Sequence, residues 1–175
     1  MGVGEVMDSI NLDYLITSCA VDRDIISAII KVESNGYPWV INDNTTKKIL
    51  RFNTQDEVTE KANELLSKGH NLDLGLSQIN SGNLKKLNLS VEQVIEPCTN
   101  LKAAASIFNN FYKIAALKFK GKDQVLFHTL SAYNTGSFYK GYKYAKKVFK
   151  LINIESKDIK YNVITPFNAP IMVEW

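Results

Sequence analysis

Apolar side chains recur at helical spacing along most of this chain. The segment RDIISAIIKVE, residues 23–33, carries isoleucine and valine around most of its circumference, so we predict a largely buried helix there. Asp22 stands at the N-cap position, and Asn35-Gly36 followed by Pro38 is a typical helix end. The same reasoning predicts further helices at about residues 8–20, 54–66, 81–87, 90–96, 98–118, 123–133 and 138–151. Thr54 and Ser90 have capping-box spacing at the start of two of them.

Two short segments have a different pattern, in which β-prone residues flank a polar turn. WVIND and ILRFN lie on either side of residues 44–48, and we predict a small hairpin near residue 45. NLDLGLSQIN, residues 71–80, has a glycine between apolar residues and is predicted as a loop or irregular turn. The fold class is therefore mostly α, with a small β-hairpin insertion.

The length of 175 residues is typical of one domain, and we expect a single domain over residues 1–175. Its core should span about residues 10–150, followed by an extended tail over about 151–175 that contains two prolines. Apolar residues make up 45% and charged residues 22%, a balance that excludes a disordered chain or a collagen-like repeat. No stretch approaches the roughly 20 apolar residues of a membrane span. We expect a monomer.

The net charge of +3 is too small to indicate a nucleic-acid partner, and we expect none. The basic charge is nevertheless uneven, because residues 140–160 contain seven lysines against Glu155 and Asp158. This stretch is either a solvated helix face or a surface that meets an anionic polymer.

The cysteines and histidines limit the possible site chemistry. Cys19 and Cys98 fit either two small buried thiols or one disulfide in an oxidising compartment, and the residues leave both readings open. His70 and His128 lie far apart and outside any metal-ligand spacing, so we expect neither a metal nor a cofactor. The first residues, MGVGEVMDS, lack the features of a signal peptide, which fits a cytosolic chain or a mature chain without its leader.

Glu33 is the residue most informative about chemistry. It follows Ile30 by three positions and Ile29 by four, so it projects from the apolar face of its helix. A carboxyl on that face leaves water, which raises its pKa and suits a general acid. The alternative is a glutamate at a helix end that turns outward to solvent.

Three polar segments favour the catalytic reading: ESNGYP, GLSQIN and SAYNTG. They offer Gln78, Asn80, Tyr133 and Asn134, which are neutral groups able to donate and accept hydrogen bonds. Neutral hydrogen-bonding groups with aromatic rings suit an uncharged polymer such as a sugar chain.

In this order and at these separations, the three segments resemble the signature motifs of family 1 lytic transglycosylases, which cleave peptidoglycan and have a goose-lysozyme-like fold. The resemblance covers about residues 15–140 and is closer to the small members that serve type IV secretion and conjugation systems. These also carry a Cys-Ala before the catalytic helix, the segment NLDLGLSQIN and a P-C-x-N-L segment, here PCTNL.

The resemblance implies a role for each matching residue. Glu33 matches the single catalytic acid/base, Ser34 the serine that follows it, and Gln78 a substrate-binding glutamine. Tyr133 matches a tyrosine that hydrogen-bonds the catalytic carboxyl, and Asn134 completes the third motif. We therefore expect a half-buried Glu33 within hydrogen-bond reach of Tyr133.

Further implications concern the rest of the site and its surroundings. Asn80 is expected among the substrate-binding residues, and Cys19 is expected to pair with Cys98 in a periplasmic protein. The substrate would be peptidoglycan glycan strands, the partners secretion-apparatus proteins, with no cofactor. Two departures stand out: Ser77 replaces the usual methionine, which removes an apolar sugar contact, and Asn35 replaces the usual glycine.

The motifs supply one carboxyl, whereas ordinary glycosidases use two. We expect Asp73, the nearest other acid, to orient the GLSQIN turn and to point away from the cleft. The resemblance then implies a non-hydrolytic route that closes a 1,6-anhydro ring on the muramyl residue. Two alternatives remain: a hydrolytic muramidase, and a non-catalytic wall-binding assembly factor that uses Tyr37, Trp39 and Tyr133 as platforms.

Overall fold

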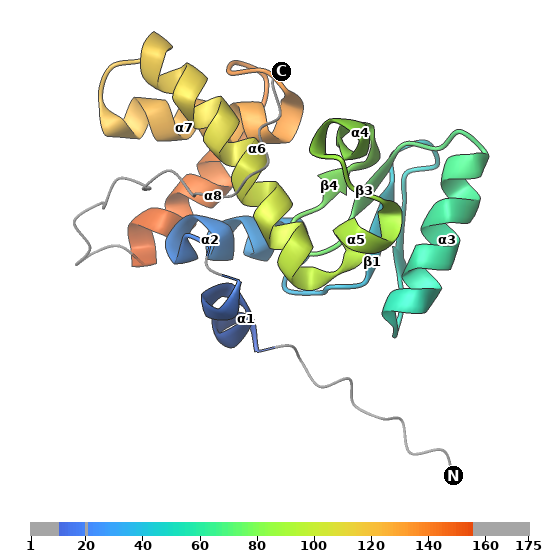
Figure 1. Ribbon diagram of the computed structural model, residues 1–175. Helices are drawn as coiled ribbons and strands as arrows, with labels where there is room; N and C mark the ends of the chain where they lie inside the picture. Colours follow the sequence, from blue (N-terminus) through green and yellow to red (C-terminus); the bar gives the residue numbers. More distant parts are fainter. Residues whose placement is uncertain (1–10, 20, 156–175) are drawn as a thin grey trace.

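The computed structural model describes residues 11–19 and 21–155, and its elements follow the predicted order (Figure 1). Within those residues the helices occupy the eight predicted places, with small shifts at their ends. The helices are α1 (Leu12–Ser18), α2 (Arg23–Glu33), α3 (Gln55–Ser67), α4 (Leu84–Leu87), α5 (Val91–Ile95), α6 (Pro97–Lys118), α7 (Lys122–Thr135) and α8 (Tyr142–Glu155), with a 3-10 turn η1 (Ser81–Asn83). The strands are β1 (Val40–Asp43), β2 (Lys48–Arg51), β3 (Leu72–Leu74) and β4 (Ile79–Asn80).

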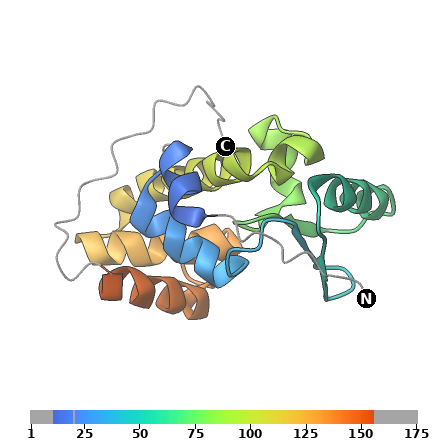
Figure 2. The same ribbon diagram turned by 90° about the horizontal axis from the view of Figure 1, so that it is seen from below.

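The buried helix α2 packs within the helical part of the molecule, against α1, α6 and α8 (Figure 2). Asp22 caps it as predicted, because its carboxylate accepts the N–H of Ile25 at 3.1 Å. Ile26, Ile29 and Ile30 are buried almost completely, which confirms the largely buried helix. Burial of three such side chains stabilises the fold by several kcal/mol, on the order of 1.5–3 each.

The sheet is larger than predicted, because NLDLGLSQIN forms two further strands rather than a loop. The strand order is β2-β1-β3-β4 and every neighbouring pair is antiparallel. Leu72 and Leu74 are fully buried while Asp73 between them is not, which is the period-two pattern of a strand. The strands are only three and two residues long, so this pattern is too short to stand out in the sequence.

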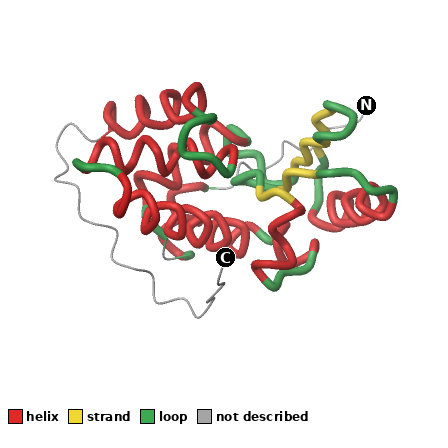
Figure 3. Tube along the Cα trace, turned by 90° about the horizontal axis from the view of Figure 1, so that it is seen from above, coloured by secondary structure: helices red, strands yellow, loops and turns green. Residues whose placement is uncertain are grey.

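The sheet lies between the helical part of the molecule and α3, as Figure 3 shows. Helix α3 begins at the predicted cap, where the Thr54 hydroxyl accepts the N–H of Glu57 at 3.3 Å. Val58, Ala62 and Leu65 are its buried residues, spaced by four and three positions. The helix therefore uses one apolar stripe for packing and leaves the opposite face to solvent.

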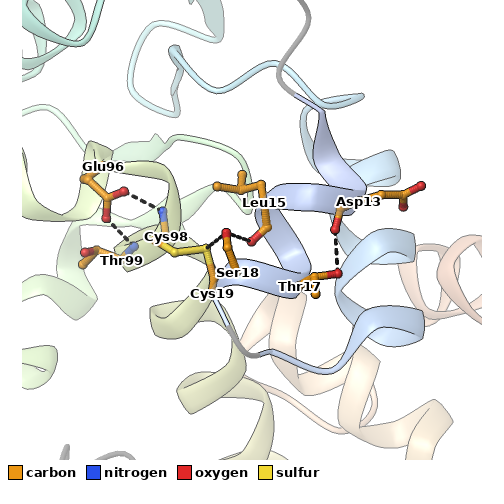
Figure 4. The surroundings of a disulfide bond; sticks show 8 residues. All are labelled: Asp13, Leu15, Thr17, Ser18, Cys19, Glu96, Cys98 and Thr99. Atoms are coloured by element: carbon orange, nitrogen blue, oxygen red, sulfur yellow. Dashed lines mark hydrogen bonds between the residues drawn. A yellow bond between two sulfur atoms is a disulfide. The ribbon is translucent and has the colours of Figure 1, made fainter.

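A disulfide joins Cys19, directly after α1, to Cys98 in the first turn of α6 (Figure 4). The Cα atoms are 5.3 Å apart, within the usual range for a bridge. Glu96 caps the same turn, because its carboxylate accepts the N–H groups of Cys98 at 2.9 Å and Thr99 at 2.7 Å. Of the two readings that the residues left open, the disulfide is correct.

Helix α8 differs from its predicted range at both ends. It begins at Tyr142 rather than about residue 138, because Gly141 packs against α7 and donates its N–H to the Ser131 hydroxyl at 2.9 Å. It continues to Glu155, past the predicted helix end at about residue 151, and residues 156–175 of the predicted tail lie outside the described residues. Among the described helices, none combines the length and apolar character needed to span a bilayer.

Candidate active site

Glu33 is the last residue of α2, where the helix ends at the wall of a cavity. The helix stops because Asn35 and Gly36 adopt left-handed conformations, with φ of 54° and 87°. Asn35, where the family usually has glycine, is one of the few other residue types that tolerates this conformation. The ESNGYP segment therefore ends α2 and leaves the Glu33 side chain half-buried, as expected.

The surroundings of Glu33 raise its pKa from 4.5 to about 7. Burial is the main cause, since it removes water from the charged form. The Tyr144 hydroxyl opposes the rise by interacting with the carboxylate, and the negative charge of Asp73 adds to it. A carboxyl with this pKa can both donate and accept a proton near neutral pH.

Tyr133 does not make the hydrogen bond that the sequence predicts, because its hydroxyl donates to the Ser77 carbonyl at 3.1 Å. Burial, and to a smaller extent its negative neighbours, still raises the pKa of Tyr133. Tyr133 therefore links α7 to the turn between β3 and β4, and the group beside the Glu33 carboxyl is Tyr144.

Tyr144 of α8 is the site residue that the sequence reasoning missed. Its hydroxyl is buried and makes no hydrogen bond of standard geometry within residues 11–19 and 21–155, although it interacts with Glu33. Its ring stacks on that of Tyr133 with centroids 6.3 Å apart. Tyr144 lies outside the three motifs, in the lysine-rich stretch. The available signal was its spacing of four and eight positions from Val148 and Ile152, which share its buried face.

Asn100 of the PCTNL segment holds the turn that carries the second motif. Its side chain is fully buried, accepts the N–H of Ser77 at 2.8 Å and donates to the Leu74 carbonyl at 2.9 Å. Gly75 has a φ of 74°, and a Cβ at this position would lie 2.5 Å from Asn100 Nδ2. Glycine is thus required at position 75 for both backbone conformation and space.

This turn decides which side chains of GLSQIN face the cavity. Gln78 has a φ of 50° and donates from Nε2 to the Gly75 carbonyl at 2.8 Å. Ser77 is fully buried and does not line the cavity, so its side chain offers no contact to a ligand there.

Asp73 lines the cavity with Glu33, contrary to the expectation that it points away. Its neighbours on β3 are the buried leucines, and strand alternation therefore turns Asp73 to the opposite face. Asn80 is its direct partner across the β3–β4 pair and donates to it at 2.7 Å. The site consequently contains a second carboxylate that the three motifs did not indicate.

The cavity has a volume of about 740 Å³, within the range of sites that bind small or extended ligands. It is bounded by the end of α2, the sheet, α6 and the end of α7. The expected residues that line it are Glu33, Ser34, Gln78, Asn80, Tyr133 and Asn134. The structure thus brings together every site residue that the motifs suggested, while the disulfide lies elsewhere and supports the fold.

The geometry agrees with comparisons to known proteins. The family model described as the transglycosylase SLT domain matches residues 15–155. This chain belongs to the transglycosylase SLT family. The match begins within α1 and runs to the end of α8, so it includes every element that lines the cavity.

Similar proteins are found in several bacteria. The chain is 35% identical to the protein virB1 of Rhizobium radiobacter over 146 residues, covering 81% of this chain and 61% of that relative. It is 37% identical to the protein virB1 of Agrobacterium fabrum over 132 residues, covering 74% and 53% respectively. The type IV secretion system protein virB1 of Brucella abortus is 32% identical over 155 residues, covering 83% and 65%. The chain thus spans 53–65% of the length of these relatives, and no solved structure matches it significantly.

The two histidines of the SLT domain serve the fold. His70 Nδ1 lies 2.8 Å from the buried carboxylate of Asp43, which joins the β1–β2 turn to the segment before β3. His128 Nδ1 lies 2.8 Å from the Phe138 carbonyl, and its ring stacks on Phe119 at 3.8 Å. Within the described part of the chain, no three His, Cys, Asp or Glu side chains gather in a way that could hold a metal ion.

The aromatic platforms of the wall-binding alternative are dispersed in the SLT domain. Of Tyr37, Trp39 and Tyr133, the last alone lines the cavity. Tyr37 donates its hydroxyl to the Phe52 carbonyl at 2.9 Å, and Trp39 packs partly buried against the core. The three rings therefore do not form one continuous sugar-binding surface along the cavity.

Proposed function

We propose that this SLT domain is a lytic transglycosylase that cleaves the β-1,4 bond between N-acetylmuramic acid and N-acetylglucosamine. The observation that carries the proposal is Glu33, a half-buried carboxyl with a pKa of about 7 at the wall of a largely polar cavity. One group that serves as acid and then as base needs a pKa near the working pH.

In the first step, the Glu33 carboxyl donates its proton to the glycosidic oxygen as the bond to the muramyl C1 breaks. The N-acetyl group of the substrate stabilises the cationic centre that develops. In the second step, the Glu33 carboxylate takes the proton of the muramyl 6-hydroxyl, whose oxygen bonds to C1. The product is a 1,6-anhydromuramyl end, and no water is consumed. The 6-hydroxyl is already tethered, so its high effective concentration favours it over water.

Other groups of the cavity have supporting roles in this proposal. Gln78, Asn80, Tyr133 and Asn134 offer neutral hydrogen bonds to the hydroxyl and acetamido groups of the glycan. Ser34 is mostly buried, donates to the Ile30 carbonyl at 3.4 Å and accepts the N–H of Gly36 at 3.2 Å. Its direct role is therefore to shape the turn after Glu33, beside the reacting sugar.

We further propose that this activity opens the cell wall locally during assembly of a type IV secretion or conjugation apparatus. The relative from Brucella abortus is named a type IV secretion system protein, and the similarity extends over 83% of this chain. The disulfide supports an oxidising compartment such as the periplasm, where peptidoglycan is found. Proteins of the apparatus are the expected partners, and one domain acting as a monomer is the expected form.

A hydrolytic muramidase is the second candidate, and the position of Asp73 in the cavity favours it. A base that activates water lies about 6.5–9.5 Å from the acid in inverting glycosidases. Against this role, both Asp73 oxygens already accept hydrogen bonds from asparagine amides. We therefore rank the lytic transglycosylase first.

Digestion of purified peptidoglycan followed by mass spectrometry of the fragments separates these candidates. The lytic transglycosylase releases 1,6-anhydromuropeptides, whereas a muramidase releases reducing fragments that are heavier by one water. Glu33→Gln is the test variant and exposed Glu60→Gln is the matched control. Glu33→Gln should lower turnover by about 10⁴-fold or more, because acid and base are lost together, whereas Glu60→Gln should be unaffected.

The same variant tests the non-catalytic alternative. If the wild type and Glu33→Gln clear peptidoglycan at the same low rate yet sediment with it equally, the domain is a wall-binding module. If Glu33→Gln retains substantial turnover, another carboxyl donates the proton, and Asp73 is the first to examine.

A further inference from the structure

Asp73 stands at the centre of a cluster of asparagine side chains on the cavity side of the sheet. Its Oδ2 accepts hydrogen bonds from Asn44 at 2.7 Å and Asn42 at 3.3 Å, and its Oδ1 accepts one from Asn80 at 2.7 Å. Two of these donors come from β1 and the residue directly after it, and the third comes from β4, so two segments far apart in sequence hold one carboxylate.

A second layer fixes the amides themselves. The Asn71 side-chain oxygen accepts hydrogen bonds from Asn44 at 3.0 Å and from Asn80 at 2.9 Å. The Asn80 oxygen in turn accepts the N–H of Gly82 at 3.0 Å, which sets the direction of its amide nitrogen. The cluster therefore presents N–H groups to Asp73 from a rigid frame, and a carboxylate, which only accepts, is the form that fits.

All the donors to Asp73 are neutral. In residues 11–19 and 21–155, no lysine, arginine or histidine forms an ion pair with it. Arg51, the cation that lines the same cavity, has its guanidinium 5.8 Å from the centre of the Tyr37 ring. A half-buried carboxylate usually pairs with a cation or is exposed to water. Here the amides that donate to the Asp73 carboxylate are neutral, and its charge acts on Glu33 across the cavity that both residues line.

We propose that Asp73 is a positioning residue for the reaction, a fixed anion whose field keeps the Glu33 carboxyl in its proton-donating form. The role rests on the proposed function. Like-charge repulsion disfavours a second carboxylate in the same cavity, so Glu33 holds its proton until a sugar oxygen takes it. After that transfer, the same repulsion makes the Glu33 carboxylate a stronger base toward the muramyl 6-hydroxyl. One fixed charge thus assists both steps while Asp73 itself transfers no proton.

The other groups around Glu33 are consistent with Asp73 as the fixed charge and Glu33 as the group that transfers the proton. Tyr144 from α8 interacts with the carboxylate and favours its charged form, whereas burial and Asp73 favour the neutral form. Tyr133 from α7 is engaged with the Ser77 carbonyl. Arg51 on β2 is exposed. Asp73 is therefore the charged group that reinforces the effect of burial.

The test is Asp73→Asn, which removes the charge and keeps the size. We expect the alkaline limb of the pH profile of kcat/KM to move to lower pH, by a few tenths to about one pH unit. The two enzymes should have similar rates near pH 5.5 and should differ by about 2–8-fold at pH 7.5, the ratio that such a shift of a midpoint near 7 implies. The matched control is Asp56→Asn, which removes an exposed carboxylate from α3.

A purely structural role would lower the rate by the same factor at every pH and leave the midpoint unchanged, and that result would overturn the proposal. A titration of the Glu33 side-chain carbon by NMR gives the same midpoint without substrate. A lower midpoint in Asp73→Asn supports the role of Asp73, and an unchanged one contradicts it. If the wild type does not cleave peptidoglycan while this NMR midpoint moves, the proposed function fails and the effect of Asp73 on Glu33 stands.

Discussion

Asn100 in the first turns of α6 accepts the backbone N–H of Ser77 at 2.8 Å, although 23 residues separate the two in sequence. The same side chain donates to the carbonyls of Leu74 at 2.9 Å and Val94 at 2.8 Å. Because the disulfide anchors the start of this helix two residues earlier, the PCTNL segment fastens α6 to α1 and to the β3–β4 turn. The position of Gln78 in the cavity follows from these covalent and hydrogen-bonded links.

Asn100→Ala should therefore weaken both the fold and the site. Three buried backbone groups lose their partner, and each unsatisfied group lowers stability by about 1–3 kcal/mol, with partial recovery through water. We expect a loss of about 2–4 kcal/mol in the free energy of unfolding, measured by urea denaturation. Asn110→Ala on the same helix is the control and should change stability by less than about 1 kcal/mol. Equal stability of both variants would contradict the role of Asn100.

Tyr144→Phe should move the alkaline limb of the activity profile to higher pH, opposite to Asp73→Asn. The Tyr144 hydroxyl favours the charged form of Glu33, so its removal raises the pKa of that carboxyl further above 7. The midpoint should shift by at most about one pH unit. The ratio of the rate at pH 8 to the rate at pH 6 should be equal to or higher than that of the wild type. Tyr142→Phe on the same helix is the matched control. A shift of the midpoint to lower pH would show that the Tyr144 hydroxyl does not favour the charged form of Glu33.

Glu33→Gln should stabilise the protein at alkaline pH while it abolishes activity. The pKa of Glu33 is about 7 in the folded protein, against 4.5 for a glutamate in water, so the folded state binds more protons between these values. The contribution of Glu33 to the free energy of unfolding therefore decreases as pH rises from about 4.5 to about 7, and it stays low above pH 7. At pH 8 the variant should be more stable by about 1–3 kcal/mol. Thermal melts at pH 4 and pH 8 check this, since the difference should vanish at pH 4.

Reduction of the Cys19–Cys98 disulfide should destabilise the fold without touching the cavity. The bridge closes a long loop, with a separation of 79 positions between its ends, and such bridges contribute about 2–5 kcal/mol. Urea denaturation with and without a thiol reductant measures the loss. The double variant Cys19→Ser/Cys98→Ser should resemble the reduced protein and should not respond to the reductant.

The sequence predicted most of the helices because their caps and apolar stripes are local signals. Asp22, Thr54 and Ser90 each act at the cap position where they were expected. The motifs likewise placed Glu33, Gln78 and Tyr133 around one cavity, since their spacing reflects family resemblance rather than a local rule.

The parts that could not be predicted depend on contacts between distant segments. Asp73 faces the cavity because β3 pairs with β1 and β4, and a three-residue strand shows too little alternation to indicate which side its aspartate faces. Tyr144 reaches Glu33 because α8 packs on α2, a tertiary contact that the lysine-rich sequence around it does not indicate. Tyr133 donates to Ser77 because the turn held by Asn100 brings that carbonyl within reach.

Gln78 adopts a left-handed backbone conformation, which costs a residue with a side chain about 1 kcal/mol relative to glycine. Selection for thermal resistance alone would accordingly enrich glycine at position 78 in a library of variants. Selection for digestion of the cell wall should retain glutamine, because the proposed function uses the Gln78 amide to bind the glycan. The two screens should therefore select different residues at position 78. The difference in stability between the glycine and glutamine variants would measure the cost of keeping glutamine in the cavity.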